Sequence, residues 1–436
     1  MLIDKLNGVS DFTFNDIVET VSADQIKTTH FLQTFPILQS ESKNDPLHQV
    51  ELAQKIKEMR DYIDSLSPDQ KAAAQSEDTL VNIAYFARII AMAHPGWDHF
   101  DTNPFQRAVE DLYREQKQLR QTEQVKGRKL LEEFFRITAT TIPDNHLTVK
   151  TRDGQFPLEK GIKKTLESWK DPKIRHDKGT VGQNMAFRLT EVGDILALEY
   201  LAGDQKRPTL VAERTIGGEK TGIIAFPNST VCWGGKTQMQ EIKALRRIVD
   251  TFKKYQSSWK NVIIDVRNNG GGDGFPIREI AETLYGNKVP YCLNTQKRNT
   301  VESQMRLLFS GKEEDYIGPA LSFKGEKKGL YILVDKEVAS SAESIVPMLK
   351  HYPGVLFIGE NTCGCCQYGA IRPIALPNGG QVNVGSVFRS YEDGMVECIG
   401  HAPDINCSGR DAFRETINLI GNRGIRSMSA YRDNTK

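Results

Sequence analysis

A serine pair at positions 340 and 341 is the part of this sequence best suited to nucleophilic chemistry. The apolar residues 329–335 predict a buried strand, and a helix is predicted over residues 340–352. A serine at such a junction presents its hydroxyl at a turn, where the first amides of the helix have no intrahelical partner. These amides could stabilise the oxyanion that forms when Ser340 attacks a carbonyl. Capping of the helix is the alternative reading of this serine pair.

A glycine-rich turn follows another apolar strand upstream. Residues 261–266 predict the strand, Gly270, Gly271 and Gly272 form the turn, and a helix is predicted over residues 275–286. Consecutive glycines let a backbone approach a ligand closely and turn its amides outward. The spacing of a dinucleotide loop and the Gly-Lys-Ser/Thr of a phosphate loop are both absent, so a nucleotide site is not predicted. A tight turn remains the alternative.

Two further segments complete an ordered set of motifs: a strand ending in a Gly/Cys loop at 355–369, and a turn at 397–404. In this order, the segments resemble the carboxyl-terminal processing (tail-specific) proteases and the tricorn core protease, a family of serine peptidases. The resemblance extends to the Asp-Gly-His motif of that family, which is matched by residues 142–146. The matching segments in the second half of the chain are Arg267–Gly272, Val338–Glu343, Ile358–Gly364 and Gly400–Asp404.

The resemblance implies a fold, an activity and a set of site residues. The fold would be an α/β, ClpP/crotonase-like core with a mostly parallel sheet and crossover helices, plus an N-terminal helical domain. The activity would be that of a serine endopeptidase acting on a peptide or protein substrate without a cofactor or metal ion. Ser340 would be the nucleophile, and the amides of Ser341 and of Gly271 or Gly272 would bind the oxyanion.

The general base departs from the pattern of the processing proteases. Their catalytic lysine lies 25 residues after the nucleophile, where this chain has Cys365, and there is no lysine between Lys350 and Lys436. The tricorn branch uses histidine with a supporting glutamate instead. By that resemblance, His146 is the expected base and Glu397 is expected to orient it.

Two other histidines near the motifs are set aside. His351 would lie about 15 Å from Ser340 along the predicted helix, which is too far for proton transfer. His401 lies in a turn where the family accepts varied residues, and a structural role is expected for it.

Several alternatives stay open at this point. Ser341 could be the nucleophile if the register of the motif slips by one residue, and Cys365 could act as a thiol nucleophile or pair with Cys398. The seven cysteines could also be small buried residues, or the cluster at 363–366 could bind a metal ion. Because the lysine is missing, the chain could instead be an inactive protease-fold protein that binds a peptide or an apolar ligand.

Composition limits the classes of partner. The net charge is +1, which gives no electrostatic reason to expect nucleic acid as a partner. The longest apolar stretch, residues 80–93, is too short and too polar to span a bilayer. The N-terminus shows no signal-peptide pattern, so a cytoplasmic location is expected by default. A homo-oligomer is compatible with the sequence.

The order of predicted elements suggests four regions. Residues 1–146 are expected to form a helical domain, and residues 147–220 a small mixed region that lacks the PDZ domain of many processing proteases. Residues 221–425 are expected to form the catalytic core, with residues 426–436 as a tail. Alternating strands and helices in the core predict parallel strands. The helices expected in the first region are 50–66, 80–93, 105–119 and 130–137, and the further strands are 195–200, 209–213, 221–226 and 355–360, with a helix at 236–256.

Overall fold

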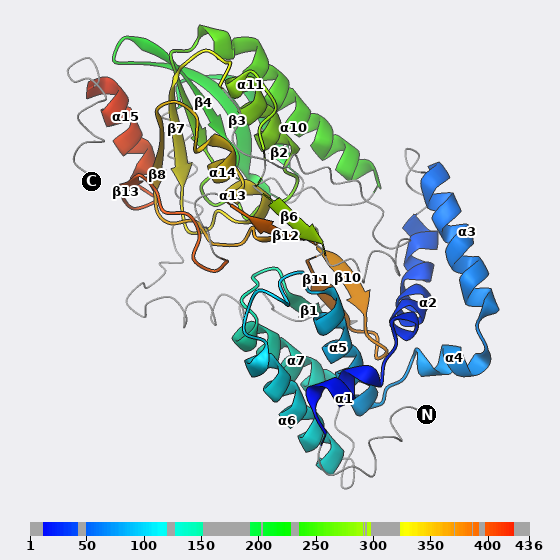
Figure 1. Cartoon of the computed structure of the whole chain (residues 1–436). Coiled ribbons are helices and arrows are strands. Elements are labelled where there is room, and N and C mark those ends of the chain that lie inside the picture. Colours follow the sequence, from blue (N-terminus) through cyan, green and yellow to red (C-terminus); the bar gives the residue numbers. More distant parts are fainter. Residues whose placement is uncertain are drawn as a thin grey trace. The chain divides into compact units, whose positions relative to one another are not determined.

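The computed structural model divides the chain into two units, which are described separately (Figure 1). The first unit comprises residues 1–175, 295–314 and 367–389, and the second comprises residues 176–294, 315–366 and 390–436. Within them the structure describes residues 12–41, 49–119, 127–150, 192–201, 204–227, 235–290, 292, 294–297, 323–369, 371–385, 387–391 and 397–422.

Helices dominate the first unit. Thr13 and Ser67 are the N-caps of two of them and form capping boxes. In each box the N-cap side chain accepts the backbone amide three residues later, and the side chain of that later residue accepts the N-cap amide. The helix of residues 79–93 begins at Asp78, whose carboxylate accepts a hydrogen bond from the Leu80 amide at 2.9 Å. The described helices are α1 (Phe14–Glu19), α2 (Ala23–Glu41), α3 (Gln49–Ser65), α4 (Pro68–Ala73), α5 (Thr79–Ala93), α6 (Asn103–Leu119) and α7 (Gly127–Thr141).

A small antiparallel sheet completes the core of the first unit. Its strand order is β1-β11-β10, and α2, α5 and α7 contact it. Apolar residues of β10 and β11, among them Ile374 and Val382, are buried with those of the helices in one cluster. A further sheet has the order β6-β12-β9. The strands are β1 (Thr148–Lys150), β6 (Asn294–Lys297), β9 (Tyr368–Gly369), β10 (Arg372–Ala375), β11 (Gln381–Val384) and β12 (Val387–Ser390).

The second unit is built on a seven-stranded sheet with the order β13-β8-β7-β5-β4-β3-β2. From β4 to β13 neighbouring strands are parallel, whereas β2, β3 and β4 pair antiparallel. The central strands β5 and β7 are buried apart from Gly329 at the start of β7, as expected for parallel strands covered on both faces. The bounds are β2 (Asp194–Leu201), β3 (Asp204–Ile216), β4 (Glu219–Ala225), β5 (Asn261–Asp265), β7 (Gly329–Val334), β8 (Val355–Gly359) and β13 (Ile405–Asn406).

Helices cover both faces of this sheet (Figure 1). Alternate residues of one strand face opposite layers, so Ile264 packs with the cluster of α10 and α11 while Ile263 packs with that of α15. The helices of this unit are α10 (Gly235–Tyr255), followed by the 3₁₀ turn η2 (Gln256–Ser258), α11 (Phe275–Tyr285), α13 (Ser340–Glu343), α14 (Ile345–Leu349) and α15 (Ala412–Asn422). This architecture confirms the α/β fold with a mostly parallel sheet and additional N-terminal helices.

Three details differ from the sequence predictions. Residues 340–352 form two short helices, α13 and α14, because the chain breaks at Ser344, whose hydroxyl donates to the Ser341 carbonyl. Strands β2 and β3 join the large sheet of the second unit, although they were expected within a separate region at 147–220. Residues 367–389, expected in the core, belong to the first unit.

Some expectations fall on other parts of the chain. The expected absence of a PDZ domain concerns mainly residues 151–191, and the expected tail 426–436 likewise lies outside the described residues. Among the helices in the described ranges, none combines enough length with enough apolar character to cross a membrane.

Acid is expected to destabilise the first unit through His30 on α2. His30 is buried, and its Nδ1 accepts a hydrogen bond from the Ala375 amide at 3.3 Å. Burial lowers the pKa of His30 from 6.5 to about 4, so between these values the unfolded state binds more protons than the folded state. The contribution of neutral His30 to the free energy of unfolding is therefore fully present above pH 6.5. It is lost as the pH falls toward 4, by about 3 kcal/mol in total.

Urea denaturation at several pH values checks this prediction. In His30→Gln the side chain can still accept the Ala375 amide but does not titrate, so its unfolding free energy is expected to fall less between pH 6.5 and 4 than that of the unmodified chain. Equal pH dependence in the two proteins would contradict the prediction.

Candidate active site

Ser340 has a strained backbone at the start of α13. Its φ is +53°, a left-handed conformation that is uncommon for any residue except glycine, while the preceding Ala339 is extended. Hydrogen bonds on both residues hold this conformation: the Ser340 amide donates to the Cys365 carbonyl at 2.6 Å, and the Ala339 amide donates to the Asn269 carbonyl at 3.0 Å. The Ser340 side chain is half-buried, and backbone strain of this kind is concentrated at functional sites.

The triglycine turn lies directly against Ser340. A Cβ atom built on Gly271 would be 2.6 Å from the Ser340 Cβ and 3.1 Å from the Ser341 amide nitrogen. Gly271 also has a φ of +99°, so both space and backbone conformation require glycine there. Asn269 holds the turn, because its side-chain amide donates to the Phe226 carbonyl at 2.7 Å and its oxygen accepts the Gly271 amide at 2.9 Å.

Buried charges fix the start of this turn at the end of β5. The Arg267 guanidinium donates to both carboxylate oxygens of Asp265, at 2.9 and 2.7 Å, and also donates to the Gly409 carbonyl. The Asn268 amide donates to the Asp335 carboxylate at 3.0 Å, which ties the turn to the end of β7. The turn after β5 and the turn after β7 therefore form one hydrogen-bonded structure.

Two backbone amides beside Ser340 are available to a ligand. The Gly271 amide is already bound to the Asn269 side chain. The amides of Ser341 and Gly272, by contrast, donate to no residue in the described ranges. Of the three backbone amides expected from the sequence as oxyanion donors, those of Ser341 and Gly272 are therefore still candidates.

Ser341 is placed differently from Ser340. Its side chain is buried, and its Oγ has no hydrogen-bond partner among the described residues. Its Cβ packs 3.6 Å from the position that a Cβ on Gly274 would take. A hydroxyl enclosed in this way is less accessible to a carbonyl carbon than that of the half-buried Ser340.

Glu343, the last residue of α13, fastens the loop after β8 to the Ser340 segment. Its carboxylate is fully buried and accepts the amides of Gly364 at 2.8 Å and Cys365 at 2.7 Å, together with the Thr362 hydroxyl. Burial raises the pKa of Glu343, and these donors oppose the shift. Cys365 is therefore held beside residue 340 by its backbone.

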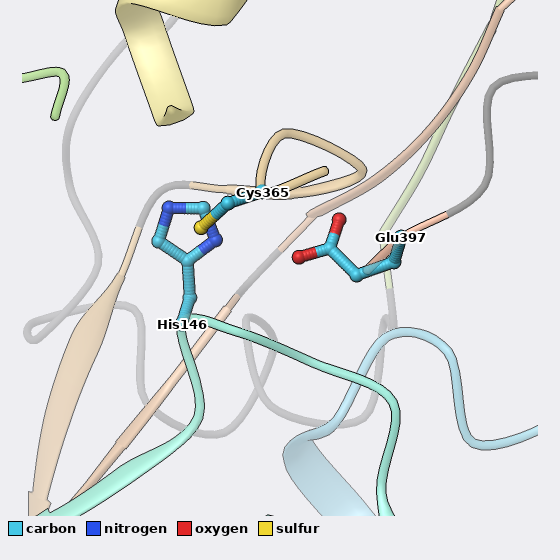
Figure 2. Close-up of side chains that lie close together, drawn as sticks. All are labelled: His146, Cys365 and Glu397. Carbon is cyan, nitrogen blue, oxygen red and sulfur yellow. The ribbon is translucent and has the colours of Figure 1, made fainter. Parts of the chain in front are cut away.

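The turn that carries Glu397 packs on the same loop. The Cys398 amide donates to the Gly364 carbonyl at 2.7 Å, and the His401 amide donates to the Thr362 hydroxyl at 2.7 Å. Glu397 is buried, and a carboxylate oxygen lies within 4.8 Å of the Cys365 sulfur. Figure 2 shows the Glu397 carboxylate turned toward the loop that carries Cys365.

The described cysteines are free thiols. The disulfide between Cys365 and Cys398 that the sequence left open is therefore not formed. Cys365 is buried, so the alternative of a thiol nucleophile at this position concerns a largely enclosed sulfur.

His146, also labelled in Figure 2, belongs to the first unit and follows α7 in a short turn before β1. Its amide donates to Asp144 Oδ1 at 2.7 Å, and its Nδ1 lies 4.0 Å from the same oxygen. Asp144 Oδ2 lies 3.0 Å from His94 Nε2, which carries the proton because His94 Nδ1 accepts the Gly96 amide. Burial lowers the pKa of His146, the Asp144 charge raises it, and Arg389 lowers it.

The second unit thus brings together six residues singled out in the sequence: Ser340, Ser341, Gly271, Gly272, Cys365 and Glu397. Two contributors were missed. Glu343 could have been noticed because it ends the Val338–Glu343 motif, and Asp144 because it precedes His146 by two residues. His351, set aside on distance, is exposed beyond α14, and His401 is buried in its turn.

Comparison with known proteins gives one family match and several similar folds. Residues 220–407 match the family model described as Peptidase family S41. No curated protein sequence matches the chain. A candidate peptidase from Parabacteroides merdae has a similar fold, with a TM-score of 0.53 and 14% identity over 81% of this chain and 100% of that chain.

Two other solved structures align with lower scores. Mature CPAF complexed with lactacystin has a TM-score of 0.49 and 12% identity over 82% of this chain and 99% of that one. A photosystem II D1 C-terminal processing protease has a TM-score of 0.43 and 13% identity over 79% and 97% of the two chains. The match over residues 220–407 confirms the resemblance drawn from the sequence, which is a resemblance to peptidases of this family.

Proposed function

We propose that the chain is a serine endopeptidase in which Ser340 attacks the carbonyl carbon of a peptide bond. The observation that carries this proposal is the strained Ser340, pressed against Gly271 beside the open amides of Ser341 and Gly272. Backbone strain of this kind is costly and is concentrated at functional sites. The two amides would bind the oxyanion, whereas Gly271 contributes by having no side chain.

In the proposed reaction, His146 takes the proton of the Ser340 hydroxyl as the bond to the carbonyl carbon forms. Collapse of the tetrahedral intermediate breaks the peptide C–N bond, and His146 gives the proton to the leaving amine. Water then attacks the acyl-enzyme as His146 takes its proton. The ester bond to Ser340 Oγ breaks, His146 returns the proton to Oγ, and the acid is released. Glu397 would orient the imidazole and stabilise its charged form.

The second candidate function is that of an inactive protease-fold protein that binds a peptide or an apolar ligand. Cys365 at the position of the family's lysine favours it, since a serine without a base is a poor nucleophile. The same geometry around Ser340 would serve binding of a carbonyl group, so a covalent readout is needed to separate the two.

Labelling with a fluorophosphonate provides that readout. We expect the unmodified chain to be labelled at one site, Ser340→Ala to lose the label, and Ser341→Ala to keep it. Label that survives in Ser340→Ala but is lost in Ser341→Ala would move the nucleophile by one residue. A folded, unlabelled wild-type chain would favour the binding protein.

The pH dependence of activity tests the role of His146. A general base must be neutral, and burial lowers the pKa of His146 below its usual 6.5, so kcat/KM is expected to hold from neutral pH to below 6.5 and then to fall. The Asp144 charge raises this pKa and the Arg389 charge lowers it. We therefore expect the acid limb to move to lower pH in Asp144→Asn and to higher pH in Arg389→Gln. Shifts in the same direction, or none, would contradict His146 as the base.

A further inference from the structure

Three potential metal ligands meet in the interior of the second unit, apart from the groups assigned to the reaction. They are Glu343 at the end of α13, Cys366 in the loop after β8 and His401 in the turn before β13. Their exposed fractions are 0%, 1% and 5%, and their ligand atoms all lie within 4.8 Å of one another. Three different segments thus place a carboxylate, a thiol and an imidazole around one point.

We propose that Glu343, Cys366 and His401 bind a zinc ion, with a water molecule as the fourth ligand of its tetrahedral coordination. Carboxylate oxygen, thiolate sulfur and imidazole nitrogen are the three ligand types that Zn²⁺ takes from proteins, at about 2.0–2.3 Å. Tetrahedral ligands at these bond lengths are about 3.6 Å apart, so an ion would draw the three atoms together by roughly 1 Å at most. This set differs from the cluster of cysteines at 363–366 that the sequence suggested, because only Cys366 of that cluster takes part.

Charge balance favours an ion at this point. A carboxylate, a thiolate and a neutral imidazole carry a charge of −2 together, and Zn²⁺ brings the buried group to zero. The Glu343 carboxylate has no exposure to solvent. A bound cation would add an opposite charge to the three hydrogen bonds that this carboxylate already accepts.

The ligands are already held by a second layer of hydrogen bonds. Glu343 Oε1 accepts from Thr362 and Gly364, whereas Oε2 accepts only the Cys365 amide, which leaves a lone pair on Oε2 for a metal ion. The Cys366 carbonyl accepts the Tyr391 hydroxyl at 2.9 Å. Such outer contacts orient the ligands of metal sites and fix their geometry in advance.

The site would join the three segments that build the catalytic centre. Glu343 lies three residues after Ser340, Cys366 follows Cys365, and His401 lies four residues after Glu397. A zinc ion here would stiffen the segments without contacting substrate. Metal binding at this site can be measured whether or not the chain is an active peptidase.

Cobalt titration tests the site directly. The full chain is stripped with a chelator and titrated with Co²⁺, and we expect one ion per chain with the visible bands of tetrahedral Co²⁺ and a thiolate-to-cobalt charge-transfer band. Zn²⁺ should displace the ion and abolish both signals. Cys366→Ser is expected to lose the charge-transfer band, and His401→Gln to bind Co²⁺ at least tenfold more weakly.

Cys363→Ser and Cys407→Ser are the matched controls, because both are free thiols outside the proposed ligand set. Both should give the unmodified spectrum, and loss of the band in either would place the ion elsewhere and overturn the proposal. If Cys366→Ser does not fold, the unmodified chain decides. It should rise in melting temperature with one equivalent of Zn²⁺ but not with Mg²⁺, and absence of both this rise and the Co²⁺ spectrum would also overturn the proposal.

Discussion

Ser340→Ala is expected to lower kcat for hydrolysis of a fluorogenic peptide by about 10⁶-fold, the size of the loss that removal of the serine nucleophile produces in subtilisin. Because nucleophile and base act as a unit, His146→Ala and the double variant should fall to the same residual level. The additive expectation would be a far larger loss in the double variant. Kinetics of the three proteins at one pH give this comparison.

Ser341→Ala is the matched control for this series. Its side chain is buried without a hydrogen-bond partner among the described residues, and the proposed oxyanion donor at this position is the backbone amide, which the substitution keeps. We expect its kcat to stay within about tenfold of the unmodified value, since neither acid–base nor oxyanion groups are removed. If Ser340→Ala retained activity and Cys365→Ala lost it, the nucleophile would be the thiol.

Gly271→Ala is expected to lower kcat by about 10²- to 10³-fold, the loss that follows when an oxyanion contact is disturbed. The new methyl group would stand 2.6 Å from the Ser340 Cβ, and the φ of +99° is unfavourable for alanine. The turn or Ser340 must move, so the serine hydroxyl and the Ser341 amide lose their mutual placement. Kinetics and fluorophosphonate labelling rates both measure this loss.

Gly270→Ala provides the control within the same three glycines. Nothing lies within 4 Å of a Cβ at Gly270, its φ is not positive, and it is exposed, so near-normal activity is expected. Equal losses in Gly270→Ala and Gly271→Ala would mean that the turn as a whole, rather than its contact with Ser340, matters.

The sequence predicted the central strands because each is a short apolar run followed by turn residues. Strands β4, β5, β7 and β8 are parallel, as the alternation with helices indicates. The sequence alone could not assign β10 and β11 to the first unit. Their buried residues, such as Ile374 and Val382, are as apolar as the core residues of the second unit. Which core a strand joins depends on contacts between residues far apart in the chain.

The neighbours of the candidate nucleophile were partly foreseeable. Ser340 and Gly271 were singled out from motifs, and the structure places them in contact. The positive φ of Ser340 and the Asn269 side chain on the Gly271 amide could not be read from residue types, because both depend on backbone geometry. Catalytic roles for His146 and Glu397 remain predictions.

The hydrogen bonds from main-chain amides to Glu343 have a consequence for the side chain at position 365. Because Glu343 holds residues 364 and 365 by their N–H groups, and Ser340 binds the carbonyl of 365, none of these bonds uses the side chain at 365. The side chain at position 365 can therefore change without the loss of these backbone hydrogen bonds. The position of the Ser340 backbone is thus independent of which side chain stands at residue 365.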